Sequence, residues 1–379
     1  MGKKRRIIVG LSIAAVSLAA LYFGGGIIAV NVVCDSLFVS RQSSLETLNG
    51  DVFQVFKTQK DYPELSARTL FTFPSGNNTL QAYKYVPSYQ AKGTVFVSHG
   101  MKGLADGTDA EYQQWFLHKG YEVISIDLSS CGLSSANAHE GPCQSPIDVA
   151  NLYKYWKEDK DSKIDKPLYL IGHSWGAYGA ACSLEYGVEA TGVITFAAFD
   201  NPRSLMFDTS QKYAGFAANI TKLPFDMALN MKYGSKADLS SSKVIESHPK
   251  VRSLHFYGDQ DERFDMPASL YGNVKESPTC KKVLLPRIGH KLPWLEEENR
   301  KTGLEILSSL KNKSMEEKAT ILKGVDKEKD SKLRGGLGMP LNLTGGQNGP
   351  FLNIAGEPLS SAALSKGKEP LIVKKDSPR

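Results

Sequence analysis

The stretch LIGHSWGAYG, residues 170–179, places Ser174 between Gly172 and Gly176, with an apolar run before it and small residues after it. A serine hydroxyl is a poor nucleophile at neutral pH, so it has to project from a sharp turn where a histidine can take its proton. A turn between a strand and a helix provides that exposure, and the glycines relieve the crowding around the serine. The pattern Gly-x-Ser-x-Gly alone is weak evidence, because chance supplies about 0.3 matches in a chain of this size. The surrounding sequence therefore has to show whether Ser174 is a nucleophile.

The sequence around this motif predicts a parallel sheet. Alternating residues at 69–73 and 80–85, separated by Pro, Gly and Asn, indicate a two-stranded hairpin. Short apolar runs then recur with segments of helical pattern between them, which is typical of strands joined by crossover helices. These runs are residues 94–97, 123–126, 168–171, 193–196, 254–257 and 283–285. We therefore expect an α/β fold with a mostly parallel central sheet flanked by helices, and Ser174 between a strand and a helix.

The partners of a nucleophilic serine should follow it, each at the carboxyl end of a strand. Asp261 comes after the run at 254–257, with Asp259 as an alternative, and His290 comes after the run at 283–285. Nucleophile, acid and base therefore stand in the order Ser174, Asp261, His290.

Two backbone amides are expected to bind an oxyanion beside the serine. The helix that begins after Ser174 places the Trp175 amide near the nucleophile, at the positive end of the helix dipole. An earlier apolar run ends in His99-Gly100-Met101, where the Met101 amide supplies the second donor.

These blocks together resemble the α/β-hydrolase fold enzymes, close to their serine-aminopeptidase and lysophospholipase-like branch, over about residues 68–310. The resemblance implies that Ser174 attacks a carbonyl carbon, that His290 acts as general base and then general acid, and that Asp261 orients the imidazole. It also implies an acyl-enzyme and an oxyanion site formed by the Met101 and Trp175 amides. The blocks that carry it are His99-Gly100, residues 127–134, the Ser174 turn, Gly258-x-x-Asp261 and Gly289-His290. We expect the substrate site to include His99, Gly100 and His173.

The chain departs from this family at one loop. Ser129-Ser130 stands where the family has Arg-Gly, so we expect the loop to be held differently. A disulfide between Cys131 and Cys143 is one possibility, and two free thiols are the alternative.

The N-terminal region predicts a membrane anchor. Four basic residues at 3–6 precede an uncharged, mostly apolar run at 7–33, which is long enough to cross a bilayer core of about 30 Å. A cleavable signal peptide is the rival, but its apolar region is usually about 7–15 residues long and ends in a small-x-small site. We favour an uncleaved single-pass anchor. The positive-inside rule then leaves the N-terminus in the cytoplasm and puts the catalytic domain outside it.

The remaining organisation follows from composition. We expect a basic flank (1–6), an anchor (7–33), a stalk (34–60), a catalytic domain (61–320) with a lid at about 201–249, and a flexible tail (321–379). An amphipathic helix from about residue 293 is expected to close the sheet. The apolar residues of the lid segment suit a binding lid or, equally, the small core of the insertion itself.

Composition narrows the function. With 379 residues, 41% of them hydrophobic, the chain has ordinary globular composition. Its net charge is +6, and its lysine and arginine residues are scattered along the sequence apart from the cluster at the start. Nucleic-acid binding is not expected, and neither a metal site nor an organic cofactor is implied. We expect a membrane-anchored serine hydrolase acting on a carboxylic ester, with a lipid or acyl ester favoured. A peptidase, amidase or thioesterase on the same fold is one alternative, and a non-catalytic binding protein is another.

Overall fold

The structure, a computed structural model, describes residues 3–35, 38, 65–105, 113, 116–117, 119–137, 140–162, 164–285 and 287–290. Most of the predicted stalk, the helix expected from about residue 293 and the predicted tail lie outside the described residues.

The described part of the chain contains an eight-stranded sheet with the order β1-β2-β4-β3-β5-β6-β7-β8. Strands β1 and β2 form the predicted hairpin, and β2 also runs antiparallel to β4. From β4 to β8 all neighbouring pairs are parallel. The strands are β1 (Leu65–Ser75), β2 (Asn78–Pro87), β3 (Thr94–Ser98), β4 (Glu122–Ile126), β5 (Leu168–His173), β6 (Gly192–Phe196), β7 (Arg252–Gly258) and β8 (Cys280–Leu285). The expected α/β fold is confirmed.

The central strands are buried on both faces, which explains why they read as continuous apolar runs rather than as alternating ones. In β3, Phe96 contributes to one core cluster while Val95 and Val97 contribute to the other. The Phe96 side of the sheet is covered by α4 (Gln144–Glu158), α5 (Trp175–Cys182), α9 (Ser241–Ser247) and α10 (Leu270–Asn273). Short 3-10 helices lie between these elements: η3 (Gly141–Cys143), η4 (Ser183–Tyr186) and η6 (Met266–Ala268).

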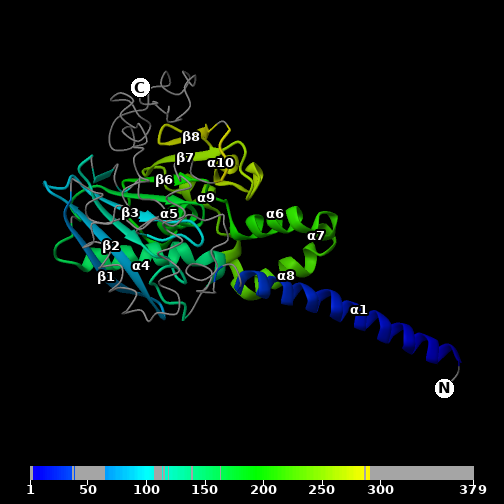
Figure 1. The fold of residues 1–379 in the computed structure, drawn as a ribbon. Helices are drawn as coiled ribbons and strands as arrows, with labels where there is room; N and C mark the ends of the chain where they lie inside the picture. Colours follow the sequence, from blue (N-terminus) through cyan, green and yellow to red (C-terminus); the bar gives the residue numbers. More distant parts are fainter. Residues whose placement is uncertain are drawn as a thin grey trace, which may run out of the picture.

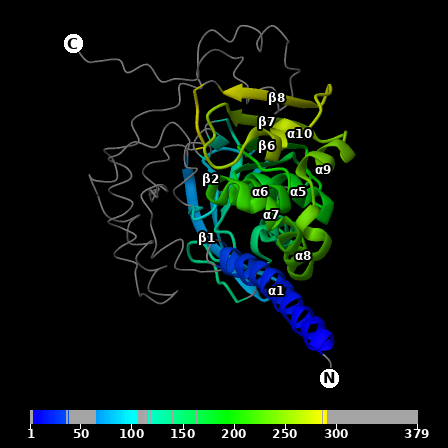
Figure 2. The same cartoon turned by 90° about the vertical axis from the view of Figure 1, so that its right-hand side faces the viewer.

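The predicted lid segment begins after β6 and forms a helical projection from the sheet domain (Figures 1 and 2). The projecting part comprises α6 (Pro202–Ala214), α7 (Phe216–Ile220), α8 (Lys222–Tyr233) and η5 (Gly234–Asp238); we call α6, α7 and α8 the lid helices. The rest of the segment predicted at about 201–249 contains α9, which packs on the sheet instead. The inner side of the projecting part has a small core that contains Met206, Leu229 and Tyr233. The segment therefore has the small core that one of the two interpretations expects, and its role as a binding lid stays a prediction.

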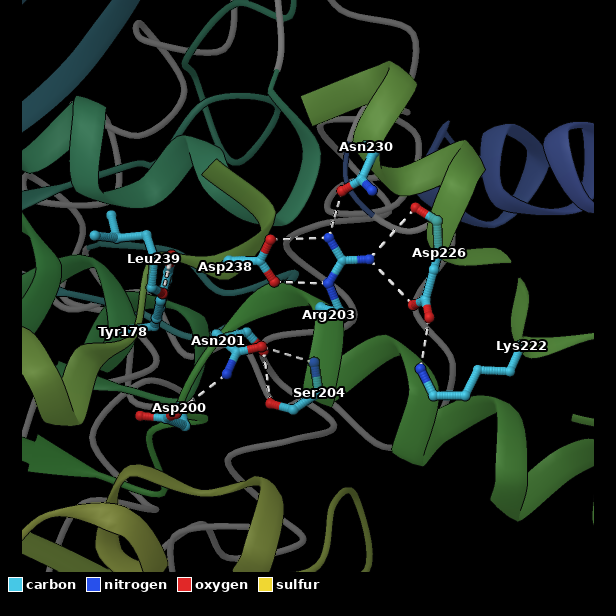
Figure 3. A network of polar contacts seen from close by, with 10 residues as sticks. All are labelled: Tyr178, Asp200, Asn201, Arg203, Ser204, Lys222, Asp226, Asn230, Asp238 and Leu239. Carbon is cyan, nitrogen blue, oxygen red and sulfur yellow. Dashed lines mark hydrogen bonds and ion pairs between the residues drawn. The ribbon is translucent and has the colours of Figure 1, made fainter. Parts of the chain in front are cut away.

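One arginine ties the lid helices together (Figure 3). The Arg203 guanidinium of α6 donates from Nε and Nη2 to both carboxylate oxygens of Asp238, at 2.6 and 2.9 Å. Its Nη1 reaches Asp226 Oδ1 at 3.1 Å, and Nη2 also donates to Asn230 Oδ1. These contacts raise the Arg203 pKa, chiefly through the bond to Asp238. A planar fork of this kind fixes direction as well as charge, so α6, α8 and η5 are held in one arrangement.

The first helix, α1 (Lys3–Cys34), extends away from the sheet domain, and only its C-terminal part contacts the lid helices (Figure 1). Residues 7–34 are long and apolar enough to cross a membrane, with a mean hydropathy of 2.2. Val30 and Cys34 are buried in the same small core as Met206 and Leu229.

Candidate active site

Ser174 lies on the sharp turn that the motif predicts. It follows β5 directly and caps α5, with φ 52° and ψ −113°, a backbone conformation that is costly for a residue with a side chain. The flanking glycines are required sterically. A Cβ on Gly172 would lie 2.4 Å from the carbonyl carbon of Gly176, and one on Gly176 would lie 2.1 Å from the Ser98 oxygen. The turn therefore holds the serine side chain outward while the backbone on both sides is packed without free space.

The structure brings Ser174, His290 and Asp261 into one hydrogen-bonded chain. His290 Nδ1 lies 2.8 Å from Asp261 Oδ2, and His290 Nε2 lies 2.9 Å from Ser174 Oγ. A carboxylate only accepts, so Nδ1 carries the proton and Nε2 is left to accept from the serine hydroxyl. The Asp261 side chain is fully buried and that of His290 is 10% exposed.

The loop after β7 selects Asp261 over its alternative. The second carboxylate oxygen of Asp261, Oδ1, accepts from the backbone amides of Arg263 at 2.9 Å and Phe264 at 3.3 Å. These bonds turn Oδ2 towards His290. Asp259 instead accepts from the Arg287 amide at 2.6 Å and thereby links the two loops.

The His290 ring is enclosed by two further rings and its backbone is held at two points. The ring lies edge-on to Phe264 at 5.2 Å between centroids and 5.1 Å from the His173 ring. The His290 amide donates to Glu262 Oε2 at 2.9 Å, and its carbonyl accepts from His173 Nε2 at 2.9 Å. Sequence reasoning missed Phe264 and Glu262, although both stand within three residues of Asp261.

His173 therefore lies directly beside His290. Because its Nε2 meets a carbonyl oxygen, that nitrogen must be the donor. Burial, followed by the charge on His290, lowers the His173 pKa to about 3, so the ring is neutral at physiological pH. Its other nitrogen faces Gly100, where an added Cβ would lie 2.8 Å from Nδ1.

His99 and Gly100 shape the loop next to the nucleophile. His99 is buried; its Nε2 accepts from the Leu128 amide at 3.1 Å, and its Nδ1 donates to the Gly100 carbonyl at 2.6 Å. Burial lowers the His99 pKa to about 4, which matches a neutral ring with one donor and one acceptor. A Cβ on Gly100 would lie 3.4 Å from Ser174 Cβ, so this loop passes directly beside the nucleophile.

Of the two predicted oxyanion donors, Trp175 directly follows Ser174, and Met101 directly follows Gly100, whose position lies beside Ser174; that their amides bind an oxyanion stays a prediction. Trp175 is the first residue of α5, where backbone amides point beyond the helix end. Met101 follows Gly100 in a turn closed by the bond from the Gly103 amide to the Gly100 carbonyl at 3.0 Å. The indole of Trp175 is buried and donates to the Pro142 carbonyl at 3.0 Å, so this side chain anchors α5 to η3.

The loop that departs from the family is held by carboxylates. Asp127 accepts from the Ala105 and Leu133 amides, and the buried Asp148 accepts from both the amide and the hydroxyl of Ser129. Burial raises the pKa of Asp148 to about 6 despite these donors. Cys131 and Cys143 are buried and no disulfide joins them, which matches the alternative of two thiols. Asp148 carries no motif, so sequence reasoning had no signal for it.

Within the described residues no three His, Cys, Asp or Glu side chains gather as a metal site. The chemistry that the arrangement offers is nucleophilic: a strained serine, an imidazole nitrogen placed to accept the serine proton, and a buried carboxylate behind the imidazole.

Comparison with known proteins gives a family for this arrangement. The family described as serine aminopeptidase, S33, matches residues 89–254. This match spans less than half of the chain, and the sheet order and crossover helices give the chain the α/β-hydrolase fold. It is a serine hydrolase, as the sequence predicts. Its sheet order, with an antiparallel second strand and a nucleophile elbow after β5, agrees with that assignment.

Several solved structures are similar to this α/β-hydrolase. An esterase of Pyrococcus furiosus is 15% identical, with a TM-score of 0.47, over 73% of this chain and 98% of the esterase. An acylaminoacyl peptidase of Pyrococcus horikoshii is 12% identical, with a TM-score of 0.46, over 72% of this chain and 44% of the peptidase. Est1E of Butyrivibrio proteoclasticus with bound ferulic acid is 14% identical, with a TM-score of 0.43, over 68% of this chain and 98% of Est1E. No curated protein matches the chain.

Proposed function

We propose that the chain is a membrane-anchored serine hydrolase that cleaves a carboxylic ester, with lipid or acyl esters favoured, through a triad of Ser174, His290 and Asp261. One observation carries the proposal: the continuous chain from Asp261 Oδ2 to His290 at 2.8 Å and from His290 Nε2 to Ser174 Oγ at 2.9 Å.

The chemistry follows from the direction of these hydrogen bonds. As Ser174 Oγ bonds to the ester carbonyl carbon, its proton passes to His290 Nε2, and Asp261 stabilises the imidazolium that forms. The Met101 and Trp175 amides donate hydrogen bonds to the former carbonyl oxygen and so stabilise its negative charge. His290 then gives the proton to the departing alkoxide, which leaves an acyl group on Ser174. A water molecule, deprotonated by the same nitrogen, releases the acid and restores the serine.

A peptidase is the second candidate, because the matching family is described as a serine aminopeptidase. Cleavage at a free N-terminus needs a carboxylate to hold the substrate ammonium. Within the part of the chain that the structure describes, two carboxylates on the loop of Asp261 already have partners: Glu262 accepts from the His290 amide, and Asp265 lies 3.0 Å from Lys212 Nζ. We therefore place ester cleavage first.

The anchoring part of the proposal is supported by α1. Its apolar segment is long enough to span a bilayer, and the basic residues before it favour a cytoplasmic N-terminus. The helix also packs into the lid core through Val30 and Cys34. A leader destined for removal has no need of such packing, so we propose that α1 remains attached and the catalytic domain stands outside the cytoplasm.

The test uses the full chain in detergent with a fluorophosphonate probe, p-nitrophenyl esters of increasing chain length and a set of aminoacyl amides. We expect labelling of the wild type, no labelling of Ser174→Ala, and loss of ester turnover in Ser174→Ala and His290→Ala. Turnover of amides with none of esters would favour the peptidase. A folded wild type that shows neither labelling nor turnover would contradict the enzymatic proposal and support a binding protein.

A further inference from the structure

The lid helices carry a continuous apolar stripe on their solvent side. Most large hydrophobic side chains exposed on the described body, apart from those of α1, gather here, and the others are scattered. The stripe residues range from 45% to 86% exposed. We call them the lid stripe: Tyr213, Phe216, Ile220, Leu223, Met227 and Met231.

Five of the six lid-stripe residues lie on one face of the nearly continuous helix that α7 and α8 form, and Tyr213 lies at the end of α6. Hydrogen bonds of helical spacing cross the junction of α7 and α8, because the Thr221 amide donates to Ala217 O and the Phe225 amide donates to Thr221 O, both at 3.1 Å. At 100° per residue, the stripe positions from 216 to 231 fall within about 80° of one another. The opposite side of the same helices is buried, at Ala218, Ala228 and Leu229. The stripe is therefore surface that the fold leaves uncovered, not part of the lid core.

The position of α1 places this stripe at the depth of a membrane. Tyr22 Oη donates to the Ile220 carbonyl at 2.5 Å, and Gly26 lies against Pro224, where an added Cβ would be 2.6 Å from Pro224 Cβ. Before Tyr22, every residue from 7 to 21 is exposed. These residues rise only about 22 Å, which is less than the bilayer core of about 30 Å. A helix that spans the core must therefore place Tyr22 to Gly26, and the lid beside them, within the membrane boundary.

Polar groups mark where α1 reaches water on the domain side. Lys232 Nζ lies 2.7 Å from Asn31 Oδ1 and 3.0 Å from Asp35 Oδ1. Asn31 is about one and a half turns beyond Gly26, and Asp35 is about two and a half turns beyond it. The contact of Gly26 with Pro224 therefore lies about 8 Å deeper than Asn31, a depth that amphipathic helices commonly reach in the headgroup and acyl boundary.

We propose that the lid stripe is immersed in the lipid leaflet from which α1 emerges, so that the catalytic domain sits on the bilayer through its lid as well as through its anchor. This inference rests on the proposed role of α1 as a membrane anchor. The lid follows β6 and touches the acid loop, since the Asp265 amide donates to Asp208 Oδ2 at 3.2 Å. The lid thus meets the loop that carries Asp261, and the substrate class that an immersed lid suits is an amphiphilic ester drawn from the leaflet rather than a water-soluble one.

Site-specific fluorescence tests the immersion directly. The native cysteines that the structure describes are buried, so a cysteine introduced at an exposed position is labelled selectively with the environment-sensitive dye NBD. Phe216→Cys and Leu223→Cys report on the stripe, and Ile164→Cys, at an apolar position 60% exposed on the sheet domain, is the matched control. Each full-length variant is reconstituted into phosphatidylcholine vesicles. We expect a blue shift and quenching by brominated lipid at 216 and 223, and quenching only by aqueous iodide at 164.

The other outcomes separate the possible failures. Iodide quenching at 216 and 223, in a chain that resists alkaline carbonate extraction, would overturn the lid proposal and leave the anchor intact. Release of the chain by carbonate would overturn the anchor and the lid proposal together, while triad labelling would remain unaffected. Protection from both quenchers would mean that protein covers the stripe, as in contact between two copies, and would also overturn the proposal.

A second variant tests the functional consequence. Phe216→Glu with Leu223→Glu places two charges on the stripe without touching the triad. We expect about a tenfold loss of turnover on a long-chain ester presented in vesicles, because charged side chains resist immersion, and unchanged turnover of p-nitrophenyl acetate. Equal rates of wild type and variant on both substrates would contradict the proposal.

Discussion

The nucleophile elbow and the lid helices differ in how tightly their residues are packed. At the elbow, Gly172 and Gly176 leave no room for even one methyl group, and the neighbouring His99 and His173 are neutral. On the lid, side chains as large as Phe216 and Tyr213 stand mostly exposed. The elbow has to fix reacting atoms to within fractions of an ångström. The lid has only to present an apolar surface in a fixed direction, which Arg203 ensures (Figure 3). Rigidity is concentrated where bonds are made.

The largest difference in effect between the elbow and the lid helices is expected when the volume of a single side chain is changed slightly. In Gly176→Ala, the added Cβ would lie 2.1 Å from the Ser98 oxygen, so β3 and α5 have to separate. We expect ester turnover to fall about 100-fold or more, because a shift of about 1 Å at reacting atoms costs that much. Leu223→Ala removes three carbons from an exposed lid position and is the matched control.

For Leu223→Ala we expect a change in unfolding free energy of less than about 0.5 kcal/mol and unchanged turnover of a soluble ester. Turnover of p-nitrophenyl acetate and the urea midpoint, measured in detergent for both variants, check the pair. If Gly176→Ala kept wild-type turnover, the elbow would be more adaptable than its packing indicates.

A smaller effect is expected from His173, which separates positioning from substrate contact. His173→Ala removes the bond from Nε2 to the His290 carbonyl, so the base is less well placed while the substrate keeps its contacts. We expect kcat to fall by about 10- to 100-fold with KM nearly unchanged, measured with a p-nitrophenyl ester.

His173→Gln offers the matched comparison, because its side-chain amide can still donate to the same carbonyl. Partial recovery of kcat is expected for this variant. A rise in KM with kcat unchanged would instead assign His173 to substrate binding, as the sequence interpretation had it.

Sequence reasoning reached the fold and the candidate triad because both depend on local patterns. The parallel strands are buried on both faces and read as apolar runs, while the elbow needs glycine at two fixed positions beside Ser174. The order of Asp261 and His290 after the serine follows from strands that end at one edge of the sheet. Each of these features leaves its mark within a few residues of sequence.

What sequence reasoning could not reach depends on contacts between distant segments. Asp148 stabilises the loop at Ser129 across 19 positions of sequence, and His173 meets His290 across 117 positions. The apolar residues of the predicted lid suited a binding lid or the small core of the insertion equally, because periodicity alone does not say which side packs inward. Only the contact between α1 and α8 places the apolar face of the lid relative to the anchor.

Substitution of His255, which lies in neither the nucleophile elbow nor the lid helices, is expected to have the smallest effect on activity. It is expected to have a clear effect on how the free energy of unfolding depends on pH. His255 is buried in β7, where its Nδ1 lies 2.8 Å from Thr195 Oγ1, and burial lowers its pKa to about 3. In the unfolded chain its pKa is about 6.5. Protons therefore bind the unfolded chain first, and the stability that His255 contributes is complete above pH 6.5 and is lost as the pH falls towards 3.

His255→Asn keeps a polar group near Thr195 but cannot be protonated. Between pH 6.5 and 4.5 we expect the variant to lose about 2–3 kcal/mol less unfolding free energy than the wild type, measured by urea denaturation in detergent, with turnover at neutral pH unchanged. Parallel curves for the two proteins would mean that His255 takes up a proton without unfolding. In that case we would assign the loss of unfolding free energy at low pH to His99 and His173. Unfolding in acid would then disrupt the nucleophile elbow at the same pH as the sheet.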